Sequence, residues 1–400
     1  MQGPALELAD IFRRHGPGYR KAHPMPLEHL RIMRAIETCR TAALGGHVEQ
    51  CGQCPHRRVL YNSCRNRHCP KCQSLARAKW LEARKAELLP VEYFHVVFTV
   101  PQTIATIAFY NKAVIYNILF RATSETLLTI AGDPKHLGAE IGFFAILHTW
   151  GQNLRHHPHL HCVVPGGGLP ADEEHWVGCR PGFFLPVRVL SRLFRRVFLE
   201  MLQKAYDNGE LRFFTDLERL RDSRKLFHEY LKPARENDWV VYAKPPFGGP
   251  AQVLEYLGRY THRVAISNQR LVGMADGQVS FEWKDYRDRD QNKCKTMTVT
   301  ADEFIRRFMQ HALPPGFQRI RHYGLMANCN RKGKLALCRK LLSMPIAELL
   351  PNPKRDHRDL YEQLTAQSLR FCPKCKTGVM AIAGILEPCR YPAVVKQDSS

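Results

Sequence analysis

Residues 39–72 are dense in cysteine and histidine and poor in large apolar side chains. A segment of this composition cannot bury enough apolar surface to fold by itself, so a bound metal ion has to hold it together. Two Cys-x-x-Cys knuckles, Cys51/Cys54 and Cys69/Cys72, stand 14 residues apart in this segment. Four thiolates at that spacing predict one closed, tetrahedral zinc site with a structural role.

Other potential metal ligands surround these four cysteines. Cross-bracing would let two further pairs hold a second zinc ion, although the first pair is widely spaced for a knuckle. These pairs are Cys39 with His47 and Cys64 with His68. A separate C-terminal knuckle, Cys372/Cys375, is followed only by Cys389 and has no evident fourth ligand. The sequence therefore leaves both a second zinc ion and a C-terminal zinc ion open.

The charge of the chain indicates a polyanionic partner. Fifty-nine Lys and Arg residues against 37 Asp and Glu residues give a net charge of +22, and nucleic acid is the usual partner of so basic a protein. The N-terminus lacks the apolar run of an export signal, and His95, Gln102, Asn111 and Lys112 interrupt the apolar stretch from Val91 to Phe120. We therefore expect a cytoplasmic, nucleoid-associated protein without membrane contact, whose 14 cysteines are reduced.

The pattern of apolar residues predicts a mixed α+β protein. Residues 93–101, 141–150 and 159–168 have the β-branched and aromatic composition of buried strands, whereas 103–131 and 187–203 have helical patterns. Asp276-Gly277 lies between two strand-like runs and predicts a hairpin. Because strands and helices do not alternate regularly, we expect an antiparallel sheet covered by helices, with 93–101 and 159–168 as adjacent inner strands.

Two short motifs carry candidate catalytic residues. His159 and His161 are two positions apart on a predicted strand, so both imidazoles point to the same face and could hold one divalent ion. Tyr256 and Tyr260 are one turn apart on a predicted helix. From spacing alone, the tyrosines also fit an ordinary helix packed on a sheet.

Taken together, the motifs resemble those of the two-tyrosine HUH transposases of rolling-circle insertion sequences, the insertion-sequence-91 family. The resemblance covers residues 25–345. It rests on GHVEQCGQC…YNSCRNRHCPKCQ, YFHVVFTVP, HHPHLHCVVPGGG and EYLGRYTHRVAIS in this order, with WKDYRD and RIRHYGLMAN beyond them.

The resemblance implies an HUH-endonuclease-like fold and metal-dependent nicking and transfer of single-stranded DNA between element ends and a target. His159 and His161 would bind Mg²⁺ or Mn²⁺, with Gln152, His95 or His148 as the third ligand. Tyr256 and Tyr260 would form 5′-phosphotyrosine links. The expected regions are an N-terminal helical segment (1–38), a zinc-binding domain (39–75), the catalytic domain (76–300), a mostly helical region (301–370) and a cysteine-containing tail (371–400).

Two other functions remain compatible with the residues themselves. A plasmid or phage replication initiator would use the same histidine and tyrosine chemistry. A zinc-dependent DNA-binding protein without catalysis would place the tyrosines in a core and make the histidine tract incidental. The oligomeric state, the DNA sequences recognised and the order of attack by the tyrosines are not encoded in any pattern that we identify.

Overall fold

A computed structural model describes residues 6–85, 87–247, 252–253, 258, 264–284, 294–344, 356–365 and 368–389. The chain forms two compact units, each assembled from separate stretches of sequence. One unit comprises residues 83–261 and 313–351, and the other comprises residues 1–82, 262–312 and 352–400. No helix within the described residues combines the length and the apolar character that a membrane crossing requires.

A five-stranded antiparallel sheet is the centre of the first unit, in the order β12-β4-β5-β3-β8. The expected adjacent inner strands are confirmed, because β3 pairs with β5 from Tyr93↔Pro165 to Thr99↔His159. The strands are β3 (Tyr93–Thr99), β4 (Gly142–Trp150), β5 (His156–Pro165), β8 (Val241–Phe247) and β12 (Ile320–Gly324). Strand β12 adds an edge strand within a region that the sequence predicts to be mostly helical.

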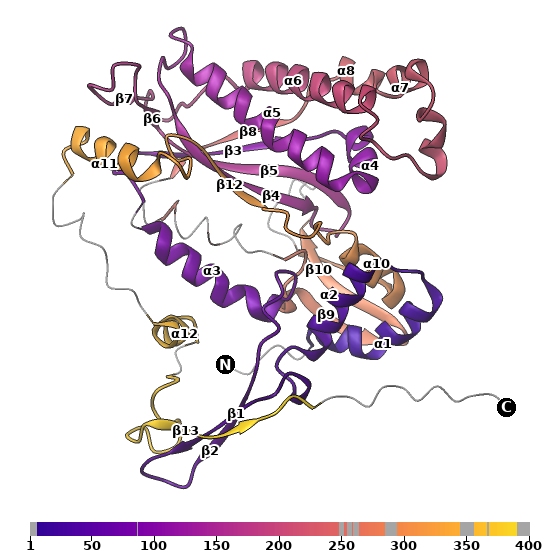
Figure 1. The fold of residues 1–400 in the computed structure, drawn as a ribbon, viewed down its shortest axis with the longest axis vertical. Coiled ribbons are helices and arrows are strands. Elements are labelled where there is room, and N and C mark those ends of the chain that lie inside the picture. The colour runs from indigo at the N-terminus through magenta and orange to yellow at the C-terminus, as the bar shows by residue number, and fades with distance from the viewer. Residues whose placement is uncertain are drawn as a thin grey trace. The chain divides into compact units, whose positions relative to one another are not determined.

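Helices cover one face of this sheet, as Figure 1 shows for α4, α5 and α6. Alternate side chains of the inner strands, such as Phe98 and Leu160, are fully buried in the core beneath them. The covering helices are α4 (Gln102–Tyr110), α5 (Lys112–Gly132) and α6 (Val187–Asp207). The remaining elements of this unit are β6 (Gly167–Gly168), β7 (Val177–Gly178), η2 (Thr215–Leu220), α7 (Arg224–Tyr230), α8 (Lys232–Glu236) and α11 (Arg331–Leu341).

The helix expected over 103–131 is two helices that meet at Asn111. The Asn111 side chain donates to the carbonyls of Ile107 and Arg212 and accepts from the Arg212 N–H, at 3.0, 2.8 and 2.7 Å. These hydrogen bonds satisfy the buried Asn111 amide and the backbone groups where α4 ends and α5 begins. The break between the two helices therefore costs little stability.

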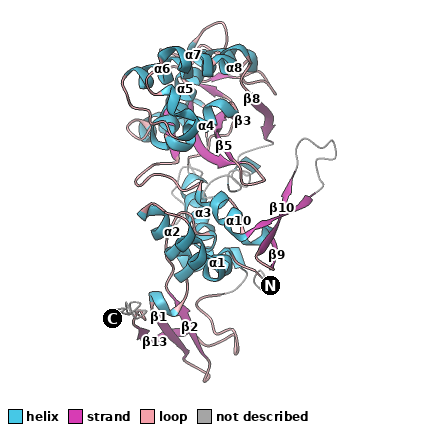
Figure 2. Cartoon of the chain, turned by 90° about the vertical axis from the view of Figure 1, so that its right-hand side faces the viewer, coloured by secondary structure: helices cyan, strands magenta, loops and turns pink. Residues whose placement is uncertain are grey.

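The second unit contains a small sheet, β11-β10-β9, packed near helices. Strands β9 (Leu271–Ala275) and β10 (Gln278–Lys284) form the expected hairpin, in which Asp276 and Gly277 have φ of +48° and +71°. Figure 2 shows this hairpin beside α10. The other elements are α1 (Leu8–Ala22), α2 (Leu27–Thr38), η3 (Asn268–Arg270), β11 (Cys294–Thr300) and α10 (Ala301–Met309).

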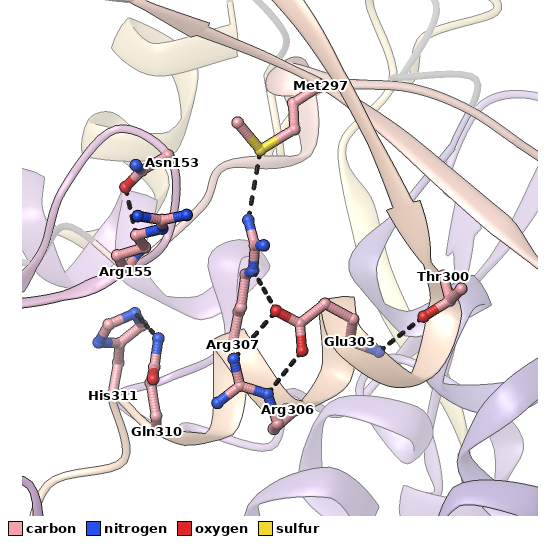
Figure 3. A network of polar contacts seen from close by, with 9 residues as sticks. All are labelled: Asn153, Arg155, Met297, Thr300, Glu303, Arg306, Arg307, Gln310 and His311. Carbon is pink, nitrogen blue, oxygen red and sulfur yellow. Dashed lines mark hydrogen bonds and ion pairs between the residues drawn. The ribbon is translucent and has the colours of Figure 1, made fainter.

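Helix α10 begins with a network of charged side chains, shown in Figure 3. Thr300 caps the helix by accepting a hydrogen bond from the Glu303 N–H. The Glu303 carboxylate accepts hydrogen bonds from both Arg306 and Arg307, at 2.6–2.9 Å. Hydrogen bonding from Arg306 is the main reason that the pKa of Glu303 falls to about 2.

A three-stranded sheet, β13-β1-β2, brings the C-terminal strand against the N-terminal hairpin (Figure 1). It consists of β1 (Gly46–Cys51), β2 (Arg57–Tyr61) and β13 (Met380–Leu386). The remaining elements are η1 (Ala42–Leu44), α3 (Pro70–Lys85) and α12 (His357–Thr365).

The two units differ in extent from the expected regions, which follow one another along the chain. Residues 262–312 do not group with 83–261 but with the N-terminal and C-terminal stretches. The reason is long-range contact: α10 packs on α1, where the rings of Phe308 and Phe12 have centroids 5.4 Å apart, and β13 pairs with β1. Such pairings leave no local sequence signal.

Candidate functional site

Three histidines meet on the face of the five-stranded sheet opposite the covering helices. His159 and His161 are alternate residues of β5, and His148 lies directly across from His159 on β4. The candidate ligand nitrogens of these three side chains all lie within 4.8 Å of one another. His148 and His161 are buried, whereas His159 is half-buried. The sequence-predicted pair is therefore brought together, and a third histidine joins it.

The hydrogen bond made by His159 identifies its tautomer. His159 Nδ1 lies 2.7 Å from the carbonyl oxygen of His157. A carbonyl only accepts, so Nδ1 carries a proton, and in the neutral imidazole Nε2 then keeps its lone pair. A neutral imidazole in this tautomer has the form that metal ligation requires.

His95 contacts His161 instead of joining the group of three. Its Nε2 lies 2.8 Å from His161 Nδ1, and the two rings stack with centroids 5.0 Å apart. Burial lowers the pKa of His95 to about 3, with smaller contributions from Lys244 and His159. A neutral His95 can accept a hydrogen bond from the Nδ1–H group of His161, an arrangement that orients a metal-binding imidazole.

His156, in the same tract, belongs to the core. Its Nδ1 donates to the Ala105 carbonyl at 3.1 Å, so its Nε2 accepts from the Tyr116 hydroxyl at 2.8 Å. Burial lowers the pKa of His156 to about 3. The histidine-rich tract is thus divided between a structural histidine and the group that faces away from the helices.

Eight cysteines form two clusters, and both clusters differ from the predicted grouping. Cys51, Cys54, Cys69 and Cys72 do not surround one point. The structure instead brings together Cys39, Cys64, Cys69 and Cys72 in one cluster and Cys51, Cys54, Cys372 and Cys375 in the other. Each knuckle is locally as expected, but the strand pairing of β1 with β13 selects the partner of Cys51 and Cys54.

The first cluster lies between α2 and α3. Cys39 caps the C-terminal end of α2, and Cys72 is in the first turn of α3. The Sγ atom of Cys72 lies 3.6 Å from those of both Cys39 and Cys64. Hydrogen bonding from Cys64 is the main reason that the pKa of Cys39 falls to about 7. These contacts fit a metal-binding site made only of thiolates.

The two histidines proposed for a second zinc ion lie outside both clusters. His47 Nε2 is 3.5 Å from a Glu49 carboxylate oxygen on β1, and His68 is not among the cluster members. The sequence signals for the observed grouping were the extra cysteines at 39 and 64 and the third Cys-x-x-Cys motif at 372. Cys389 is exposed and lies outside both clusters.

The tyrosine pair lies outside the described residues. The backbone of Gln252, Val253 and Gly258 is described in this segment, but Tyr256 and Tyr260 are not. Their expected position over the histidine face stays a prediction.

Family comparisons agree with the order of these features along the chain. Residues 11–100 match the family described as "Transposase zinc-binding domain" (Zn_Tnp_IS91), and residues 142–333 match the family described as "Putative transposase" (Y2_Tnp). The zinc-domain match contains the whole first cysteine cluster, and the transposase match contains all three clustered histidines and the tyrosine pair.

Solved structures of a conjugative relaxase, TrwC, in complex with oriT DNA are also similar. The metal-free complex is 13% identical, covers 62% of this chain and 72% of the relaxase chain, and has a TM-score of 0.23. The metal-bound complex has the same identity and coverage and a TM-score of 0.25.

Two relatives extend the similarity to most of the chain. The "Putative transposase y4qJ" of Sinorhizobium fredii (strain NBRC 101917 / NGR234) is 63% identical over 383 residues, covering 95% of this chain and 96% of the relative. The transposase for insertion sequence element IS801 of Pseudomonas savastanoi pv. phaseolicola is 29% identical over 301 residues, covering 72% of this chain and 68% of the relative. The chain therefore belongs to the family of insertion-sequence-91-type transposases.

Proposed function

We propose that this transposase cuts one strand of DNA and transfers it through 5′-phosphotyrosine links, using a divalent metal ion bound by His148, His159 and His161. The observation that carries the proposal is the convergence of these three imidazoles, within 4.8 Å of one another, on one face of the sheet. A protein that used the histidine tract only as core or surface would have no need to bring them together.

His148 is the best candidate for the third ligand among the three that the sequence left open. It faces His159 across the antiparallel register, so both side chains rise from the same side of the sheet. His95 instead contacts the far nitrogen of His161, as a positioning residue would. Gln152 is not among the clustered residues.

The three imidazoles would hold the ion and would leave coordination positions for oxygen atoms of DNA. Mg²⁺ and Mn²⁺ both take six ligands, and imidazole suits Mn²⁺ better than the oxygen-preferring Mg²⁺. Such an ion, when bound, would polarise the scissile phosphate and neutralise charge that develops during attack. His95 would hold the His161 ring by accepting a hydrogen bond from its Nδ1–H group.

Tyr256 and Tyr260 would supply the nucleophiles. A phenolic oxygen forms a bond to phosphorus while the bond to the 3′ oxygen breaks, leaving a 5′-phosphotyrosine and a protonated 3′-OH. The phosphodiester link keeps the bond energy, so a 3′-OH can reverse the step and reseal a strand without ATP. Two tyrosines would allow two DNA ends to be held at once.

Positive charge near the histidines favours the binding of a DNA strand there. Lys244 is paired with His95 in the register of β8 and β3, so it lies on the histidine face. The chain as a whole carries a net charge of +22, which attracts nucleic acid and makes binding depend on salt. We therefore expect the protein to act on single-stranded element ends and on target DNA, at the nucleoid.

The first cysteine cluster would bind a structural zinc ion. Four thiolates close a tetrahedral site and leave no position for substrate. The ion would join the end of α2, through Cys39, to the start of α3, through Cys72. Cys64 and Cys69 complete the proposed ligand set.

The direct test uses labelled single-stranded DNA from the element ends, incubated with purified protein and Mn²⁺. The expected product is a protein–DNA adduct that survives denaturing electrophoresis, and it should not form with EDTA. DNA binding without cleavage or adduct under these conditions would instead support the non-catalytic DNA-binding protein. Cleavage without an adduct would show that water attacks the phosphate.

A further inference from the structure

We propose that Cys51, Cys54, Cys372 and Cys375 bind a second structural zinc ion, which fastens the C-terminal strand to the N-terminal hairpin. The four residues come from two knuckles more than 300 positions apart in the sequence, yet they form one cluster. The family match for the zinc-binding domain ends at residue 100, so it contains only half of this ligand set. The inference does not depend on the nicking mechanism.

The distances between sulfur atoms fit a tetrahedral zinc ion. Cys51 Sγ lies 3.6 Å from Cys375 Sγ, and Cys54 Sγ lies 3.7 Å from Cys372 Sγ. A zinc ion with four Zn–S bonds of ~2.3 Å separates its sulfur ligands by about 3.8 Å. A disulfide would require a distance of about 2.05 Å between the two sulfur atoms, so these cysteines are not bonded in pairs. All four are free thiols.

Backbone N–H groups are directed at the sulfurs in the same way in both knuckles. The N–H of Gln53 donates to Cys51 Sγ, and the N–H of Lys374 donates to Cys372 Sγ, each at 3.4 Å and each two residues after the cysteine. The N–H of Gly378 adds a bond to Cys375 Sγ at 3.3 Å. These donors stabilise negative charge on sulfur, which is what a metal-bound thiolate carries.

The knuckles also contact each other around the cluster. The hydroxyl of Thr377 donates to the side-chain oxygen of Gln53 at 2.8 Å. Gly378 approaches so closely that an added Cβ would lie 2.3 Å from Cys51 Sγ. A side chain at position 378 would therefore push the two halves of the ligand set apart.

Burial of apolar side chains contributes little to holding the two knuckles together. The buried core of the cluster consists of Cys51, Cys372 and Met380, with Cys54 and Cys375 packed against it. On β13, Ile382 and Ile385 remain 62% and 78% exposed. Closing a loop of more than 300 residues onto so small a core has an entropic cost that metal–thiolate bonds can offset.

The experiment is a measurement of zinc per chain in the purified full-length protein, by elemental analysis with protein quantified independently. We expect two zinc ions in the wild type and one in the double variant Cys372→Ser plus Cys375→Ser. Cys389→Ser is the matched control, because this C-terminal cysteine is exposed and outside both clusters, and it should retain two. Equal zinc content in the wild type and the double variant, or iron in place of zinc, would overturn the proposal.

A glycine pair tests the geometry without removing any thiol. Gly378→Ala should release one of the two zinc ions to a chelator at least about tenfold faster than the wild type, a change of the size seen when groups around a metal site are disturbed. Gly384→Ala is the control, since a Cβ at this position on β13 meets nothing within 4 Å. Equal release from both variants would refute the proposed site. Neither measurement uses DNA, so a failure here is separate from a failure of the nicking proposal.

Discussion

His148 on β4 and His159 on β5 face each other across an antiparallel register, with ring centroids 5.6 Å apart. The pair shows how the sheet converts a His-x-His motif into a group of three imidazoles. The ring centroid of His161, the next residue along the same face, lies 4.5 Å from that of His148. This cross-strand relationship gives the first prediction.

His148→Ala should abolish Mn²⁺-dependent cleavage to the same extent as His159→Ala or His161→Ala. Removal of one of three proposed protein ligands leaves too few nitrogens to hold the ion. The measurement is adduct yield on labelled single-stranded DNA over a range of Mn²⁺ concentrations. Gln152→Ala is the control and should retain activity, because Gln152 lies outside the group. The assignment of the third ligand is wrong if His148→Ala retains activity and Gln152→Ala loses it.

His95→Phe should weaken Mn²⁺ affinity by about 10- to 100-fold, because the variant keeps a ring in the buried space but cannot accept a hydrogen bond from His161. Calorimetric titration of the DNA-free protein with Mn²⁺ measures the change without an activity assay. His95→Gln keeps a hydrogen-bonding side chain and should recover part of the affinity. Unchanged affinity in His95→Phe would show that His95 only packs beside His161.

The double change Tyr256→Phe plus Tyr260→Phe should abolish covalent adducts while leaving DNA affinity nearly unchanged. Each substitution removes a single oxygen and keeps the ring. Adducts are detected by denaturing electrophoresis, and DNA affinity is measured by fluorescence anisotropy at fixed salt. The two single variants identify the initiating nucleophile by which of them loses the first cleavage. Adducts that persist in the double variant would exclude both tyrosines as the attacking groups.

Glu303→Gln should lower the free energy of unfolding at pH 7 by about 1 kcal/mol, the scale of a partly exposed ion pair. The folded-state pKa of Glu303, about 2, lies below the ordinary value of 4.5. The stabilisation is therefore fully present above pH 4.5 and is lost as pH falls toward 2. Denaturant unfolding of both proteins across this range should show the difference shrinking with acid.

Glu200→Gln is the control for that measurement. Glu200 pairs with Arg196 at 3.8 Å, but both side chains are nearly 70% exposed, so its loss should change stability little at any pH. Because metal release at acid pH affects wild type and variants alike, the difference between them isolates the carboxylate. A constant wild-type–Glu303→Gln difference from pH 7 to pH 3 would contradict the assignment.

The sequence by itself determined the features that depend on neighbouring residues. The β-branched run at 93–99 predicted a buried strand, the His159/His161 spacing predicted two imidazoles on one face, and Asp276-Gly277 predicted a hairpin. Each follows from local backbone geometry. The knuckles were likewise visible as Cys-x-x-Cys motifs, and the order of the motifs was sufficient to indicate the family.

Only the tertiary structure decided which distant residues meet. The pairing of β4 with β5 brought His148 to the His159/His161 pair, and the pairing of β13 with β1 brought Cys372 and Cys375 to Cys51 and Cys54. A thiolate has the same affinity for zinc whichever knuckle supplies its neighbours, so spacing alone cannot choose the partner. Strand register makes that choice, because it fixes which side chains share a face and lie within reach of one ion.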